Sequence, residues 1–86
     1  MLTKLEARQE RVLMTWRRQE TVWQPMWAIA AAVRLASRHV FKLREAGLIY
    51  RRVSHIGRPS LYKLTPLGRV VLAGLIAIEE SQAKKS

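Results

Sequence analysis

The side chains best suited to chemistry in this chain are the arginines and lysines that recur through its middle. Between Arg34 and Arg69 there are nine Lys or Arg residues and a single acid, Glu45. Guanidinium and ammonium groups bind phosphates and other anions through charge and hydrogen bonds. Because charge of one sign also repels itself, this stretch predicts an anionic partner, with nucleic acid first and an anionic membrane surface second.

Residue types for other chemistry are scarce. All six acids are Glu, and the chain has no Asp and no Cys, which leaves no site for paired carboxylates and no thiolate nucleophile. His39 and His55 stand sixteen positions apart without further ligands, so no metal site is expected. The sequence contains no glycine-rich loop of the kind that binds phosphate groups. We therefore expect neither an enzyme nor a bound cofactor.

Length and charge place the chain among small basic proteins. It has 86 residues, a formal charge of +10 and a pI near 11.4, which predicts one domain over residues 1–86 that would gain from a partner subunit. Its longest uncharged run, residues 21–33, is too short to span a bilayer. The charged N-terminus lacks the apolar core of a signal peptide. We expect a cytoplasmic protein with no membrane partner.

Hydrophobic spacing predicts two helices in the first part of the chain. The first covers residues 3–18, with Thr3 and Glu6 as a capping box. The second covers residues 24–31, because Pro25 is tolerated in a first helical turn. Residues 30–37 contain no Gly, Pro, Asn or Asp, so two interpretations stay open: one long helix from Pro25 to Ala46, or a short helix, a turn near residues 31–34 and another helix.

The second half has clearer boundaries. Ala36, Val40 and Leu43 share one face of a helix over residues 34–46, which Gly47 ends in the left-handed conformation. Residues 48–64 then read as a β-hairpin with a basic tip. Thr65 and Pro66 start a last helix over residues 66–80, and the tail after it is expected to be frayed.

The order helix-helix-helix-strand-strand-helix predicts a mainly α fold with a small β-hairpin, the winged helix-turn-helix. The segments "VFKLREAGLIYRR" and "GRPSLYKLTPLGRVVL" resemble winged-helix transcriptional regulators of the MarR and PadR type. The matching positions are Leu43, Gly47, Leu48, Ile49, Gly57, Arg58, Pro59, Tyr62, Leu64, Thr65 and Gly68. The resemblance covers about residues 21–72 and implies DNA binding, a turn before residue 34 and a recognition helix over residues 34–46.

The recognition helix and the hairpin contain the candidate DNA-binding residues. If the apolar face of the recognition helix is buried, the basic face of this helix points outward. The basic face then either enters the major groove or is merely solvated. The expected base contacts are Arg34, Ser37 and Arg38. The expected backbone or wing contacts are His39, Lys42, Arg44, Arg51, Arg52, His55 and Arg58. Arg58, held between Gly57 and Pro59 at the tip, would suit a narrow minor groove.

The aromatic residues are expected to serve packing. Phe41 could contact a thymine methyl, but we expect it to pack against the hairpin or the first helix. Trp16, Trp23 and Trp27 are expected to be core and helix-packing residues. A pocket between them for a small-molecule effector is the less favoured alternative.

The last helix has more apolar residues than one face needs. One stripe would cover the core of the domain, and the surplus predicts a homodimer, as the resemblance also implies. The expected interface residues are Leu2, Leu5, Leu72, Leu75, Ile76 and Ile78. The alternative is a monomer in which the first helix covers the last.

The sequence thus predicts a dimeric regulator that binds specific double-stranded DNA. Two alternatives remain: a winged-helix module that binds structured RNA or a protein, and a basic protein that coats DNA without sequence preference.

Overall fold

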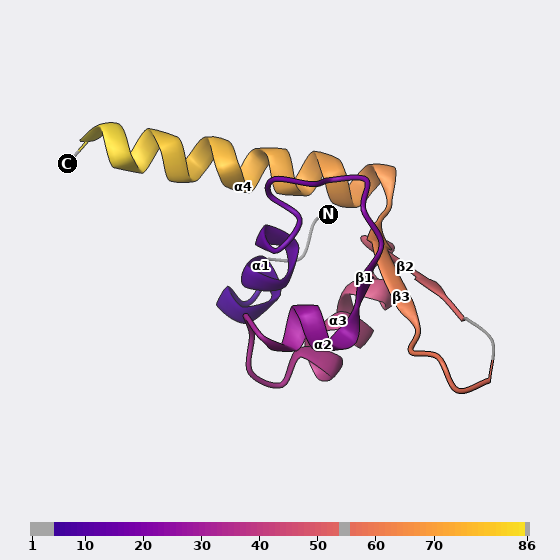
Figure 1. The fold of residues 1–86 in the computed structure, drawn as a ribbon. Helices are drawn as coiled ribbons and strands as arrows, with labels where there is room; N and C mark the ends of the chain where they lie inside the picture. Colours follow the sequence, from indigo (N-terminus) through magenta and orange to yellow (C-terminus); the bar gives the residue numbers. More distant parts are fainter. Residues whose placement is uncertain (1–4, 54–55, 86) are drawn as a thin grey trace.

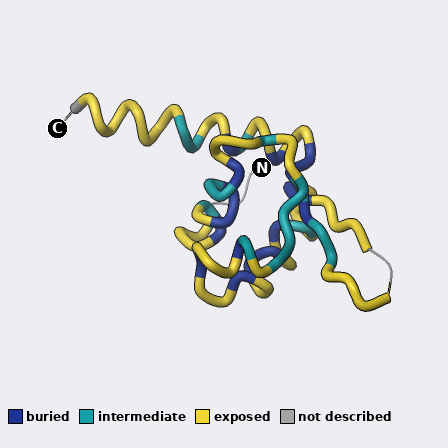
Figure 2. The backbone as a smooth tube through the Cα atoms, viewed as in Figure 1, coloured by how far each residue is buried: buried dark blue, intermediate teal, exposed yellow. Residues whose placement is uncertain are grey.

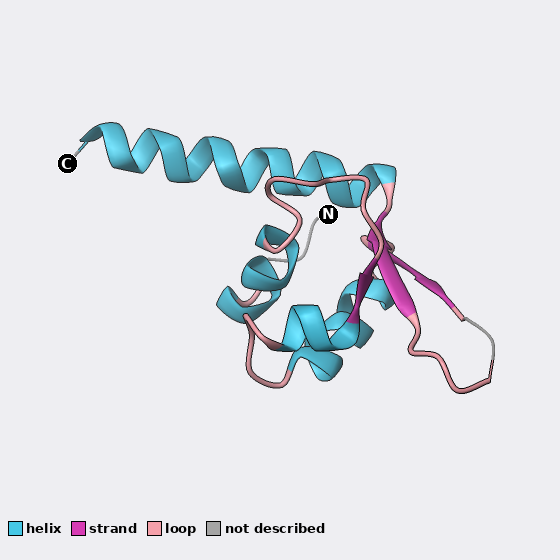
Figure 3. Cartoon of the chain, in the orientation of Figure 1, coloured by secondary structure: helices cyan, strands magenta, loops and turns pink. Residues whose placement is uncertain are grey.

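A computed structural model describes residues 5–53 and 56–85 (Figure 1). Within these residues there are four helices and three short strands (Figure 3). In chain order they are α1 (Ala7–Met14), β1 (Gln24–Pro25), α2 (Met26–Ala30), α3 (Ala36–Glu45), β2 (Ile49–Arg52), β3 (Leu61–Leu64) and α4 (Pro66–Lys85). The predicted class, mainly α with a small hairpin, is confirmed.

The small antiparallel sheet has the strand order β1-β3-β2. In its register, Ile49 pairs with Leu64 and Arg52 with Leu61, while Gln24 on the opposite edge pairs with Tyr62. The third strand, β1, was not predicted, because residues 24–25 were assigned to a helix. Pro25 is instead the extended N-cap of α2, and a proline is acceptable on an edge strand because it needs no backbone donor there.

A turn separates α2 from α3, so the interpretation with two helices is confirmed and the long helix is wrong. Leu35 takes the left-handed conformation, with φ of 58°. That backbone geometry cannot belong to a right-handed helix, and α3 therefore begins at Ala36 rather than at the predicted residue 34.

The far end of α3 closes as its sequence predicted. Gly47 is left-handed, with φ of 80°, and its N–H donates to the carbonyl of Arg44 at 3.0 Å. The N–H of Leu48 donates to the carbonyl of Leu43 at 2.9 Å. These two bonds make a Schellman motif, which satisfies the last carbonyls of the helix and sends the chain directly into β2.

The first turn of α4 locks this junction in place. The hydroxyl of Thr65 accepts a hydrogen bond from the N–H of Gly68 at 2.9 Å, which confirms Thr65 as the N-cap. The same hydroxyl donates to the carbonyl of Gly47 at 2.6 Å, and the N–H of Thr65 donates to the carbonyl of Leu48 at 3.0 Å. One residue therefore caps α4 and binds the chain between α3 and the hairpin.

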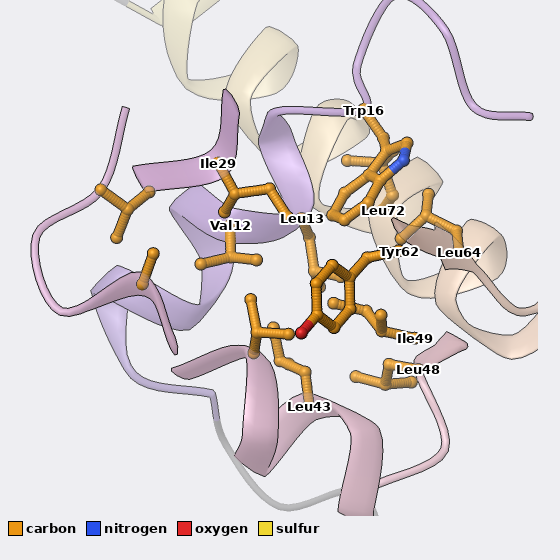
Figure 4. Close-up of a cluster of buried hydrophobic side chains, with 13 residues drawn as sticks. Val12, Leu13, Trp16, Ile29, Leu43, Leu48, Ile49, Tyr62, Leu64 and Leu72 are labelled. Atoms are coloured by element: carbon orange, nitrogen blue, oxygen red, sulfur yellow. The ribbon is translucent and has the colours of Figure 1, made fainter. Parts of the chain in front are cut away.

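The core fills the space between α1, α3, the sheet and the start of α4 (Figure 4). Its buried apolar residues are Val12, Leu13, Trp16, Ile29, Val33, Ala36, Val40, Leu43, Leu48, Ile49, Tyr62, Leu64 and Leu72. Trp16 is fully buried, as predicted, and its indole N–H donates to the carbonyl of Val22 at 2.9 Å. Trp27 is 71% exposed, so the three tryptophans do not form one buried cluster and the prediction for Trp27 is wrong.

The first helix is shorter than predicted. It ends at Met14, followed by turns through residue 18, and its capping box joins Glu6 to Gln9. The backbone N–H of Glu6 donates to Oε1 of Gln9 at 3.0 Å. Thr3, predicted as the cap, lies outside the described residues.

The last helix is longer than predicted. It continues to Lys85 and projects beyond the body of the domain (Figures 1 and 2). The tail that was expected to be frayed is helical as far as Lys85, because Ala, Gln and Lys favour a helix and no glycine or proline interrupts them. An ion pair of 2.9 Å between Arg17 and Glu79 attaches this part to the loop after α1. None of the described helices has the length and apolar character needed to cross a bilayer.

The apolar residues of α4 divide differently from the prediction. Leu72 is fully buried in the core of its own domain, so assigning it to a dimer interface was wrong. Leu5, Leu75 and Ile76 are half-buried against the same core. Ile78 is exposed, as are two residues not named for the interface, Leu67 and Val70. Leu2 lies outside the described residues.

Candidate nucleic-acid interface

The exposed face of α3 presents polar and cationic side chains. Ala36, Val40 and Leu43 are at most 3% exposed, so the predicted inward face is confirmed. The 3.6-residue period then turns Ser37, Arg38 and Lys42 outward, and all three are exposed. Arg44 is half-buried on the same helix. Arg34 is exposed as well, but it lies in the turn before α3 and not on the helix.

His39 does not lie on this outer face. Its side chain is 6% exposed, and the ring turns toward the start of α1, where Nδ1 is 3.9 Å from Oε2 of Glu6. Neither ring nitrogen has a hydrogen-bond partner among the described residues. The prediction that His39 is a surface residue in reach of a phosphate is therefore wrong. His39 directly precedes Val40 of the buried face, and its side chain faces Glu6, the N-cap of α1.

Phe41 is the reverse case. It was predicted to pack against the hairpin or the first helix, and it is instead 55% exposed. Its ring stands at the rim of a shallow concavity of about 340 Å³ that Arg44 and Tyr50 also line. An apolar ring is thus presented on the outer face of α3 beside Ser37 and Arg38.

The hairpin carries its cations away from the core. Arg51, Arg52 and Arg58 are exposed, and Gly57 at the tip is left-handed, with φ of 90°. The Nε–H of Arg51 donates to the hydroxyl of Ser60 at 3.2 Å, across the hairpin. His55, predicted to be a hairpin contact, lies outside the described residues.

The ring of Trp23 lies close to two cations of the hairpin, Arg52 on β2 and Lys63 on β3. The guanidinium carbon of Arg52 lies 5.9 Å from the centre of the Trp23 ring, and Nζ of Lys63 lies 5.6 Å from it. Both distances suit a cation–π interaction. The sequence prediction named neither Trp23 nor Lys63 for this surface. The period of the strands could have indicated this. Lys63 lies opposite Tyr50, and Tyr50 and Arg52 are two positions apart on β2, so all three share one face of the hairpin.

Few of these cations are neutralised within the described residues. Lys42 is 4.0 Å from a carboxylate oxygen of Glu6, and Arg69 on α4 is 3.4 Å from one of Glu20. No other cation between residues 34 and 69 of the described chain makes an ion pair with a carboxylate. The outer face of α3 and the hairpin together therefore form a surface with a large excess of positive charge, in which Glu45 is the acid.

Comparisons with known proteins bear on the fold. The sequence matches no family model, and no curated protein matches it. Solved structures do match. BpsR of Bordetella bronchiseptica is 24% identical, with a TM-score of 0.72 over 96% of this chain and 61% of its own. MepR of Staphylococcus aureus is 20% identical, with a TM-score of 0.76 over 95% of this chain and 63% of its own.

A third match is a zinc-responsive MarR family member, ZitR of Lactococcus lactis. It is 23% identical, with a TM-score of 0.75 over 99% of this chain and 60% of its own. The fold is the winged helix of MarR-family regulators. The resemblance inferred from the sequence is thereby confirmed for the fold, and the chain spans about three fifths of the length of these three proteins.

The winged-helix fold gives each element its usual name. The segment α2-turn-α3 is the helix-turn-helix, α3 is the recognition helix, and the hairpin of β2 and β3 is the wing. The candidate interface is therefore the outer face of the recognition helix together with the wing. These two parts meet at Leu48, the residue that α4 secures.

Proposed function

We propose that this chain binds double-stranded DNA as a small, sequence-reading transcriptional regulator. The observation that carries the proposal is the exposed face of α3, where Ser37 and Arg38 point outward, together with wing cations that pair with no carboxylate among the described residues. The fold shared with MarR-family regulators supports it, and so does BpsR, whose DNA binding is regulated by 6-hydroxynicotinic acid. We assign the surface a binding role and no catalytic one.

The recognition helix is proposed to enter the major groove. It has 10 residues, about 15 Å of helix, and a B-DNA major groove is about 12 Å wide. Side chains near the N-terminal end of such a helix reach base edges, which gives base contacts to Arg34, Ser37 and Arg38. Of these, Arg38 can bind a guanine at O6 and N7 with both ends of its guanidinium group.

The remaining cations are proposed to hold the phosphate backbone. Lys42 and Arg44 lie further along α3, and Arg51, Arg52 and Arg58 lie on the wing. Such contacts fix the position of a protein on the duplex without reading its sequence. Arg58, exposed at the wing tip, is proposed to enter a narrow minor groove, where the negative potential is enhanced. His55 stays a prediction of the same kind.

A homodimer is proposed to present two such surfaces. Ile78 is 56% exposed and Val70 is 68% exposed on α4. An open groove of about 610 Å³ runs between α1 and α4 and is lined in part by Met14, Leu75 and Ile78. Covering this groove with a second copy would bury Met14, Leu75 and Ile78. A dimer that binds two half-sites needs its recognition helices one DNA turn, roughly 34 Å, apart.

The deciding experiment is selection of bound duplexes from a random pool, with the mass of the complex measured by light scattering. The proposal expects an enriched palindromic sequence and two chains per duplex. Equal affinity for random and selected duplexes would support a protein that coats DNA. Stronger binding to structured RNA at the same salt concentration would support the RNA-binding alternative. A single chain per duplex would remove the dimer and leave the groove assignment intact.

A further inference from the structure

Phe41 occupies the centre of the surface that is proposed to read DNA. With 3.6 residues per turn, Phe41 and Arg38 lie on either side of the line opposite the four buried residues of α3, Ala36, His39, Val40 and Leu43, each about 30° from that line. Ser37 and Arg38 are its neighbours one turn earlier, at spacings of four and three residues. Phe41 is 55% exposed, so more than half of its surface is open to a partner.

The major groove offers few apolar groups to such a ring. Its floor is made of hydrogen-bond donors and acceptors, and the apolar exception is the methyl group on C5 of thymine. Cytosine methylated at C5 presents the same group at the same place in the groove. Phe41 has no donor or acceptor, so contact with the methyl is the one favourable interaction with a base edge available to it.

We propose that Phe41 is a specificity-determining residue that detects a 5-methyl group on a pyrimidine in the major groove. The inference rests on the proposed function and goes one step beyond it, because it assigns an apolar contact to the outer face of α3, whose other exposed residues near Phe41 are polar or charged. The polar neighbours set the position of the ring on the duplex. When Arg38 binds its base pair, Phe41, one turn further along α3, faces a neighbouring base. The methyl can belong to thymine or to 5-methylcytosine.

The test measures affinity for the selected duplex with each thymine replaced in turn by deoxyuridine, which lacks only the methyl group. For the unmodified protein, one position in each half-site should lose roughly fourfold in affinity, the factor that burial of one methyl-sized group supplies. In Phe41→Ala, the same replacement should change affinity by less than about 1.5-fold. Thermal melting followed by circular dichroism checks that the variant is folded, as expected for an exposed side chain.

Tyr50→Ala is the matched control. Tyr50 is an aromatic residue of similar exposure, 49%, that lines the same concavity from β2. This variant should keep the fourfold difference between thymine and deoxyuridine. A second arm places cytosine or 5-methylcytosine at the sensitive position. Tighter binding of the methylated base by the unmodified protein, and equal binding by Phe41→Ala, would identify the methyl group itself as the ligand.

Each contrary result has its own meaning. If no duplex is selected from the pool, the proposed function fails and this inference fails with it. If a duplex is selected and no deoxyuridine replacement weakens binding, only the role of Phe41 is overturned. An equal loss in the unmodified protein and in Phe41→Ala would overturn it too, because another residue would then detect the methyl group.

Discussion

The recognition helix and the wing carry the same kind of side chain on very different supports. The helix α3 buries Ala36, Val40 and Leu43 in the core and ends in two hydrogen bonds that fix its last turn. The wing is buried at Ile49, Tyr62 and Leu64, whereas the rest of β2 and most of the described residues of the tip are exposed. Figure 2 shows this contrast as a change from buried to exposed along the hairpin.

The difference fits two ways of binding a duplex. A hydrogen bond to a base edge weakens steeply as its angle departs from linear, so a side chain that reads bases needs a backbone that does not move. Attraction between a cation and a phosphate depends on distance and little on direction. A projecting hairpin whose cations have one or two supporting contacts is sufficient for that. Under the proposed function, this contrast would give specificity to α3 and mainly affinity to the wing.

The largest effect is expected where the two supports meet. A Cβ atom at Gly68 would collide with the backbone carbonyl of Leu48, and backbone cannot move aside as a side chain can. Gly68→Ala should therefore lower the free energy of unfolding by about 3 kcal/mol, as overpacking does. Because the junction at Leu48 connects α3 to the wing, the substitution should disturb the positions of both. Urea unfolding measures the loss of stability.

Gly74→Ala is the control on the same helix. No atom lies within 4 Å of a Cβ built there, so the substitution should stabilise the protein by about 0.5–1 kcal/mol through helix propensity. Equal effects of the two substitutions would show that α4 does not secure the junction at Leu48.

Arg38→Ala tests the specificity side of the comparison. Losing a bidentate contact with guanine should cost about 1–3 kcal/mol on the selected duplex and relax the preference at one base pair. Random duplexes should be affected much less. Arg18→Ala removes the same charge from an exposed position outside α3 and the wing, and it should leave the preference unchanged. A uniform loss on all duplexes would move Arg38 to the backbone contacts.

Local signals in the sequence predicted the elements that are fixed by local chemistry. Gly47 ends α3 because the left-handed conformation it adopts is open to glycine. Thr65 and Pro66 start α4 because a hydroxyl can cap a helix and a proline needs no donor in its first turn. The order of helices and hairpin follows from signals of this kind, and so does the buried spine of α3.

Features set by tertiary contacts were missed. The strand β1 exists because residues 24–25 pair with β3, and two residues are too few for a periodic pattern. His39 is buried because α1 passes over it, and Phe41 and Trp27 are exposed because no element covers them. Leu72 belongs to the core because α4 crosses the domain at that turn. In each case the side chain type allows both outcomes, and the arrangement of the neighbouring elements decides.

Arg58→Ala tests the proposed contribution of the wing to affinity, and it should have a smaller effect on binding than Arg38→Ala. Removing one phosphate contact should weaken binding to all duplexes by on the order of 1 kcal/mol and reduce the slope of log affinity against log salt by about 0.9. The base preference should not change. Affinities measured between 50 and 200 mM salt, roughly the range over which such slopes are determined, provide the check. An altered base preference with an unchanged slope would make the wing a reading element and remove the contrast with α3.

The smallest effect concerns the ring that supports two wing cations. Trp23→Leu keeps an apolar side chain and removes the aromatic face near Arg52 and Lys63, so stability should fall by about 1 kcal/mol, since exposed cation–π contacts contribute about 0.5–1 kcal/mol each. A double-mutant cycle with Arg52→Met should give a coupling energy of about 0.5 kcal/mol between the two residues.

Trp27→Leu is the matched control for the ring. Trp27 is 71% exposed, and its substitution should change stability by less than about 0.5 kcal/mol.

Loosening the wing through Trp23→Leu should lower affinity for selected and random duplexes by the same factor, because phosphate contacts do not distinguish sequences. If Trp23→Leu instead lowered affinity for the selected duplex alone, the wing would need a fixed geometry to function. The contrast between a rigid reading helix and a permissive wing would then be wrong.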